Sequence, residues 1–70
     1  MKVGDIFRWN SGWEKRGTEY VVTRIIWSRR KPGEPVKVFF KEMGKEDAEE
    51  QMEFWVRLDL YEKHETITWV

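Results

Sequence analysis

Apolar and polar residues alternate along much of the chain, with the period of two that is typical of β-strands. Residues 35–43 show the pattern most clearly. There Val36, Val38 and Phe40 fall on one face of a predicted strand, whereas Phe39 falls on the opposite face between two lysines. We therefore predict a strand with one face toward a core and one face toward solvent.

The same pattern predicts five strands, each bounded by glycine, proline or polar turn residues. They are residues 5–9, 18–27, 35–43, 53–57 and 66–70. In residues 53–57, Phe54 and Val56 are predicted to face the core and Trp55 the opposite side. The acidic segment 45–52 has no apolar stripe, so we expect a loop or a turn or two of exposed helix. Residues 58–61 break the alternation, and a short 3₁₀ turn is expected there.

The second predicted strand changes parity along its length. Tyr20 and Val22 share one face, whereas Ile25 and Trp27 have the opposite parity. A β-bulge near residues 23–24 would bring all four side chains to one face where the strand bends.

Length and composition fit one small β domain. The 70 residues include five Trp, four Phe and two Tyr, and aromatic side chains each bury a large apolar area, so a small core can suffice. We predict a single all-β domain over residues 1–70, a small, strongly bent, five-stranded antiparallel barrel of the SH3-like type. An OB-like barrel, or an open sheet with one short helical turn, is the alternative.

Charge is balanced overall but divided along the sequence. The chain has thirteen basic and thirteen acidic residues and no formal net charge. Residues 1–41 hold ten Lys or Arg against four acids, a net +6, and residues 42–70 hold three against nine, a net −6. Such a division favours a charged partner or self-association. It would cancel if the two parts lie side by side in a compact fold.

The order of glycines and aromatics resembles that of small phage and prophage barrel proteins. Residues 3–7 (Val-Gly-Asp-Ile-Phe) match an opening "G-D-x-F" strand, and residues 17–22 match "G-x-x-Y-x-V". Residues 36–38 and 54–56 fit the middle strand and the late aromatic strand. The resemblance implies an SH3-like barrel and a mobile-element origin, where small proteins often bind a host protein or nucleic acid. Structural residues carry it, so it implies no catalytic group, and the acidic segment 45–53 departs from it.

The inventory of reactive residues is poor. There is no Cys and one His, His64, and the acids lack the spacing of a calcium loop. Ser11 and Ser28 lie in predicted loops, and no phosphate-binding glycine loop occurs. We therefore expect no metal site, no cofactor and no enzymatic activity. The lack of Cys, of a signal peptide and of a membrane span favours a cytoplasmic protein.

Side chains that the alternation turns away from the core are candidates for binding. Phe39 and Trp55 are predicted to face outward among cations that include Lys37 and Arg57. They could anchor a protein interface or stack nucleic-acid bases, or a second small apolar cluster could cover them. Trp13, in the first loop, is expected to be exposed.

A second candidate is the basic turn that follows Trp27. The turn contains Arg29, Arg30 and Lys31. These residues either contact phosphate or form a charged tip that keeps the protein soluble and prevents strand pairing. The acidic residues within 46–53 are either a solvated connection or a patch that docks on a basic protein or imitates a nucleic-acid backbone.

Two binding functions follow. The first is a non-catalytic module with a protein partner. The second is a nucleic-acid-binding domain that uses Arg24, Lys37 and the basic turn with Trp27 or Trp55. The absence of net charge weakens the second, because small nucleic-acid-binding domains usually carry a basic excess. The two differ in whether cations and aromatics share a face free of the acidic segment. The partner's identity and the oligomeric state stay open.

Overall fold

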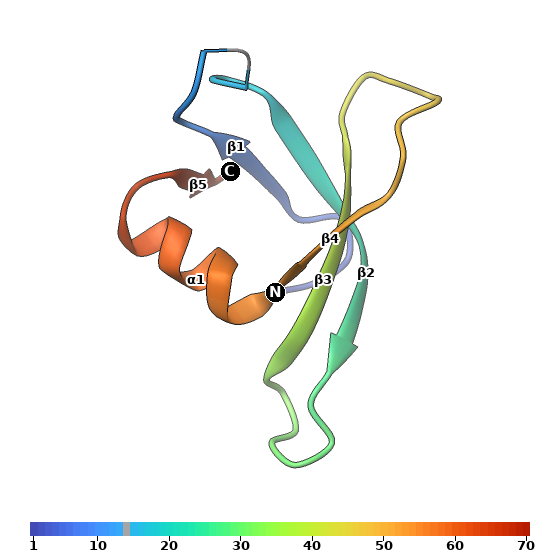
Figure 1. Cartoon of the computed structure of the whole chain (residues 1–70). Coiled ribbons are helices and arrows are strands. Elements are labelled where there is room, and N and C mark those ends of the chain that lie inside the picture. The colour runs from blue at the N-terminus through green and yellow to red at the C-terminus, as the bar shows by residue number, and fades with distance from the viewer. Residues whose placement is uncertain (14) are drawn as a thin grey trace.

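Five strands and one helix form the computed structural model, which describes residues 1–13 and 15–70. They are β1 (Ile6–Trp9), β2 (Glu19–Trp27), β3 (Pro35–Glu42), β4 (Gln51–Phe54), α1 (Trp55–Lys63) and β5 (Ile67–Trp69), shown in Figure 1. The prediction of a mostly β domain with five antiparallel strands is confirmed. No helix in the described part of the chain has the length and apolar content needed to cross a membrane.

The strands form one sheet in the order β4-β3-β2-β1-β5, and all neighbouring pairs are antiparallel. β1 to β4 follow one another as a meander. α1 then carries the chain back, so that β5 pairs with the opposite edge of β1. β4 and β5 are the two edges of the sheet, which is open. A closed barrel is therefore not confirmed. The alternative of an open sheet describes the arrangement better, although the single helical turn expected with it is a helix of nine residues.

The predicted bulge in β2 is confirmed. Val22 pairs with Phe40 and Arg24 pairs with Phe39, so that the register shifts by one residue at Thr23. Beyond the bulge, Ile25 lies on the same face as Val22 because the extra residue reverses the parity. Ile25 therefore packs against the core beside Val22. A second register shift lies between Ile26 and Trp27, and Trp27 is 43% exposed, so the expectation that Trp27 shares this face is wrong.

The predicted strand over residues 53–57 is wrong in its second half, because α1 begins at Trp55. Phe54 is the last residue of β4, and Val56 lies exposed on the helix, so neither belongs to the core. Trp55, predicted to face away from the core, is half-buried and packs against it. Three β-favouring residues in a row concealed the change from strand to helix.

The expected 3₁₀ turn over residues 58–61 is instead the middle of α1. Trp55, Leu58 and Tyr61 recur every three residues, which places them on one side of a helix. All three pack in or against the core. A helix in a small domain owes most of its stability to such packing, because an isolated helix of this length is marginal in water.

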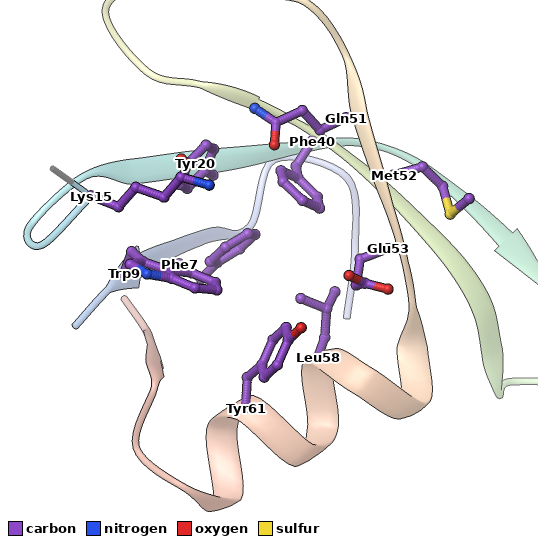
Figure 2. A pocket seen from close by; sticks show the side chains of 10 residues that line it. All are labelled: Phe7, Trp9, Lys15, Tyr20, Phe40, Gln51, Met52, Glu53, Leu58 and Tyr61. Carbon is purple, nitrogen blue, oxygen red and sulfur yellow. The ribbon is translucent and has the colours of Figure 1, made fainter. Parts of the chain in front are cut away.

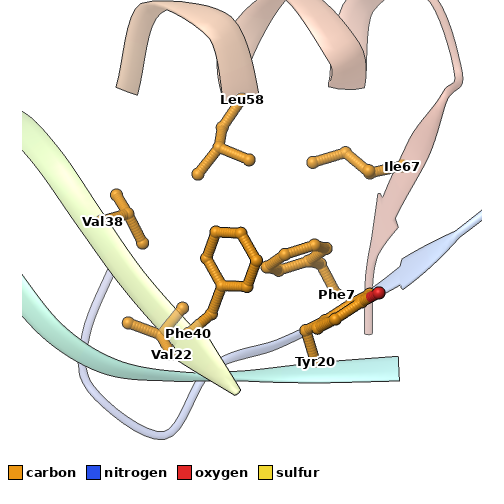
Figure 3. Packing of buried hydrophobic residues seen from close by; sticks show 7 residues of the cluster. All are labelled: Phe7, Tyr20, Val22, Val38, Phe40, Leu58 and Ile67. Atoms are coloured by element: carbon orange, nitrogen blue, oxygen red, sulfur yellow. The ribbon is translucent and has the colours of Figure 1, made fainter. Parts of the chain in front are cut away.

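The core lies between α1 and one face of the sheet, here called the inner face (Figure 3). Seven side chains form its buried cluster: Phe7, Tyr20, Val22, Val38, Phe40, Leu58 and Ile67. The ring of Phe7 lies 5.3 Å from that of Tyr20, 5.1 Å from that of Phe40 and 5.3 Å from that of Trp69. Aromatic packing around Phe7 therefore joins β1, β2, β3 and β5.

Candidate binding surface

The face of β2, β3 and β4 that points away from α1 presents two adjacent rows of paired residues. Residues paired across antiparallel strands lie on the same face. The rows are Ile26-Lys37-Phe54 and Arg24-Phe39-Met52, which we call the outer-face patch. Each row combines apolar side chains with one cation.

Three apolar members of the outer-face patch are exposed to solvent, and the fourth, Phe39, is half-buried. Ile26, Met52 and Phe54 are 42%, 41% and 45% exposed. The Arg24 guanidinium lies 3.9 Å from the ring centre of Phe39, and the Lys37 amine lies 5.7 Å from that of Phe54. Both distances allow cation–π attraction, so the cations are held beside the aromatic rings.

The acidic segment reaches the same face through Glu50. Its carboxylate accepts hydrogen bonds from the Thr23 hydroxyl at 2.7 Å and from Arg24 at 3.1 Å. The Thr23 hydrogen bond, helped by the charges of Arg24 and Lys41, holds the pKa of Glu50 below its ordinary value. Glu50 is therefore a carboxylate at neutral pH, and the cations and aromatics do not share a face free of the acidic segment.

The predicted site residues do not form one common surface. Lys37 and Phe39 belong to the outer-face patch, as expected from their parity. Trp55 and Arg57 lie on α1 instead, and the Trp55 ring is 6.5 Å from that of Trp69. The expectation that Trp55 and Arg57 face outward beside Phe39 is therefore wrong, because residues 55–57 are helical.

The basic turn lies at the tip of the β2–β3 hairpin, which extends past α1 in Figure 1. The Ser28 hydroxyl accepts hydrogen bonds from the backbone N–H groups of Arg30 and Lys31, which fixes the turn. Arg29 is exposed beside them, and Trp27 is 43% exposed at the base of the tip. Trp27 directly follows Ile26 and pairs with Pro35, so this cluster adjoins the end of the outer-face patch.

Trp13 is fully exposed in the connection between β1 and β2, as predicted. The same predicted loop contains Glu14, which lies outside the described residues. Among the described residues, no group of three or more His, Asp or Glu side chains could hold a metal ion. His64 follows α1, and its backbone N–H donates to the Leu60 carbonyl at 3.0 Å.

Sequence reasoning missed three members of the patch, namely Ile26, Met52 and Phe54. Met52 and Phe54 share a parity that alternates with Gln51 and Glu53, a pattern that could have marked the apolar pair as one face. The signal was misleading because the polar residues of β4, rather than the apolar ones, are on the core side. They line an opening in that side of the molecule.

That opening is a pocket of about 310 Å³ on the inner side, bounded by β1, β2, β3, β4 and α1 (Figure 2). Five aromatic side chains line it: Phe7, Trp9, Tyr20, Phe40 and Tyr61. Lys15, Gln51 and Glu53 add polar groups. The volume is at the lower limit of ligand pockets, which hold about 300–1,000 Å³.

The chain matches no family model, no curated protein and no solved structure in the comparisons made with each. What it binds must therefore be inferred from its own geometry.

Proposed function

We propose that the protein is a small non-catalytic module that binds a partner protein through the outer-face patch. The observation that carries the proposal is the row of exposed apolar side chains on a sheet face that no described element covers. Contiguous exposed apolar surface beside charged groups is typical of interaction sites in soluble proteins.

The patch defines the chemistry of the partner. Ile26 and Phe54 flank Lys37 in one row, so an apolar anchor of the partner would contact both while a carboxylate meets the lysine amine. Lys41 extends the cationic character along β3. A partner with an apolar residue beside one carboxylate therefore fits best, because that carboxylate can meet Lys37, whereas Arg24 is already paired with Glu50. Complementary charge of this kind sets orientation and speeds association.

Nucleic-acid binding is the second candidate, and it has weaker support. Phe39 and Phe54 are aromatic and lie among cations, as in single-strand binding sites. The guanidinium of Arg24 already lies over the Phe39 ring, however, and Glu50 would repel phosphates on the same face. The balanced net charge also gives no general attraction to phosphate.

The proposal extends to the type of fold. We propose that the open sheet is a variant of the SH3-like barrel, with α1 filling the gap between its edges. The resemblance of residues 3–7 and 17–22 to phage and prophage barrel proteins supports a mobile-element origin. On that basis the partner would be a host protein in the cytoplasm.

The proposal is tested by affinity capture from the source cell with matched variants. Ile26→Ser with Phe54→Ser removes apolar contacts from the patch. Val56→Ser with Leu60→Ser makes the same chemical change on α1, where these side chains are 72% and 49% exposed. We expect the wild type and the helix variant to retain the same partner and the patch variant to lose it.

Equal capture by both variants would contradict the patch as the site. The nucleic-acid candidate is tested by intrinsic Trp fluorescence with single- and double-stranded DNA and with RNA at low and moderate salt. Quenching that weakens steeply as salt rises would replace the protein partner with a nucleic acid.

A further inference from the structure

We infer that the aromatic pocket on the inner side binds an alkylated ammonium group. The pocket lies on the inner side of the sheet, and Met52 of the edge strand β4 borders both the pocket and the outer-face patch. The inference rests on the other lining residues and does not depend on the proposed function. Two features carry it, namely the aromatic lining of the pocket and the arrangement of charge around it.

The walls of the pocket offer π surface to a ligand. The rings of Trp9 and Tyr61 meet edge to face, with centres 5.5 Å apart and an angle of 76° between their planes. Both residues are half-buried and line the pocket. Phe7 and Phe40, buried in the core, form the interior side. Aromatic faces around a cavity attract a cation through their quadrupoles.

Charge in the pocket favours a cation. Glu53 comes from β4, is half-buried, and lies at one side of the pocket in Figure 2. Its carboxylate accepts a hydrogen bond from the backbone N–H of Phe54 at 2.9 Å. Within the described residues it forms no ion pair at 4.0 Å or less, since the four pairs found involve other acids. A cationic ligand would supply that missing charge.

The chain places an ammonium group of its own at this site. The amine of Lys15, which lines the pocket, lies 5.9 Å from the centre of the Trp9 ring. Lys15 is exposed and comes from the β1–β2 connection, so it can leave when a ligand enters. It occupies a position that a ligand ammonium would take, and it should therefore compete weakly with that ligand.

An alkylated ammonium fits the pocket better than an unmodified one. A primary ammonium is compact and strongly hydrated, so its transfer beside aromatic rings is costly. Methyl groups spread the charge and present apolar surface to the rings, which is why quaternary ammonium groups are held in aromatic cages. The group could belong to a free small molecule or to a methylated lysine side chain of a protein. Both sources share this chemistry.

The first test compares choline with its uncharged isostere 3,3-dimethyl-1-butanol, with the Trp9 indole resonance followed by NMR. We expect saturable shifts with choline and affinity for the isostere on the order of tenfold weaker, since the two differ in charge. Equal affinities, or no shift of the Trp9 resonance at any choline concentration, would overturn the inference.

Substitutions then test the roles of the Glu53 and Lys15 charges in choline binding. Glu53→Gln should weaken choline binding severalfold, whereas Glu49→Gln, the same change in the exposed loop before β4, should leave it unchanged. Lys15→Gln should strengthen binding severalfold by removing the internal competitor. If Lys15 has only a structural role, Lys15→Gln should not increase the affinity for choline. Unchanged choline affinity in both Lys15→Gln and Glu53→Gln would overturn the inference.

A third comparison distinguishes the sources. Short peptides that contain trimethyllysine, or lysine at the same position, are titrated under the same conditions. Tighter binding of the trimethyllysine peptide than of choline would identify a protein side chain as the ligand. Tighter binding of choline would identify a free small ammonium. Equal binding of the methylated and unmethylated peptides would contradict selectivity for an alkylated group.

Discussion

Both faces of the sheet formed by β2, β3 and β4 carry apolar side chains, but those side chains differ in exposure. On the inner face, Val22, Val38 and Phe40 are at most 9% exposed. On the outer face, Ile26 and Phe54 are more than 40% exposed although they are equally apolar. α1 contacts β3, β4 and β5 from the inner side. Burial in this small domain thus depends on where the helix returns. In β4 the hydrophobicity pattern alone indicates the wrong face, because its apolar residues are the exposed ones.

The largest expected effect is on the inner face, at Phe7. Phe7→Ala removes a ring that is 1% exposed and contacts three other rings. Such a truncation costs about 3–5 kcal/mol, whereas a domain of 70 residues has roughly 4–10 kcal/mol of stability. We expect a partly or wholly unfolded variant, measured by urea denaturation followed by circular dichroism. A loss below about 1 kcal/mol would contradict the central place of Phe7.

The next largest loss of stability is expected in α1, the helix that covers the inner face. Leu58→Ala should cost about 2–5 kcal/mol, because Leu58 is 1% exposed between α1 and the sheet. Leu60→Ala, two positions along the same helix, is the matched control, since Leu60 is 49% exposed. The control should change the free energy of unfolding by about 0.5 kcal/mol or less. Equal losses would show that α1 does not pack as described.

An intermediate effect is expected from Tyr20 at alkaline pH. Burial, and then the charge of Glu42, raises the pKa of Tyr20 above its ordinary value of 10.0. The folded state then holds the phenol proton more tightly than the unfolded chain does. This contribution to stability is complete below that value and is lost as pH rises toward the folded-state pKa. Tyr20→Phe should therefore lose less stability than the wild type between neutral and strongly alkaline pH, in denaturation at a series of pH values.

The smallest effect is expected on the outer face, at Phe54. Phe54→Ser removes a ring beside Lys37, an exposed contact worth about 0.5–1 kcal/mol. Phe54 is also the N-cap residue of α1 and makes no side-chain cap hydrogen bond, a role for which serine is suited by about 1 kcal/mol. We expect a net change in unfolding free energy below about 1 kcal/mol by thermal denaturation. A large destabilisation would place Phe54 in the core, as the sequence had indicated.

The two long strands and the bulge could be predicted because the alternation of apolar and polar residues within β2 and within β3 is sufficient to identify them. The parity change between Val22 and Ile25 has few explanations other than a bulge. The boundary between β4 and α1 could not be found in this way, because Phe54 and Val56 favour strands. The helix begins there without a capping side chain and is stabilised by tertiary contacts of Trp55. Local propensity was overruled by packing.

The candidate sites show the same limit. Lys37 and Phe39 were assigned to an outer face from parity within one strand, and that assignment needed no knowledge of the rest of the fold. The pocket joins Trp9, Glu53 and Tyr61 from β1, β4 and α1. Their proximity depends on how the helix crosses the sheet, which no local pattern in the sequence specifies.

The pairing of β1 with β5 has a consequence for folding during synthesis on the ribosome. β1 to β4 can pair with their neighbours as each emerges, because every hairpin joins adjacent segments. The strand contacts of Phe7 with Trp69 and of Trp9 with Ile67 join segments from opposite ends of this sequence. Contacts so distant must overcome a larger loop-closure entropy and slow folding. One edge of β1 therefore stays unpaired until β5 is released, and aggregation is most to be expected during this interval.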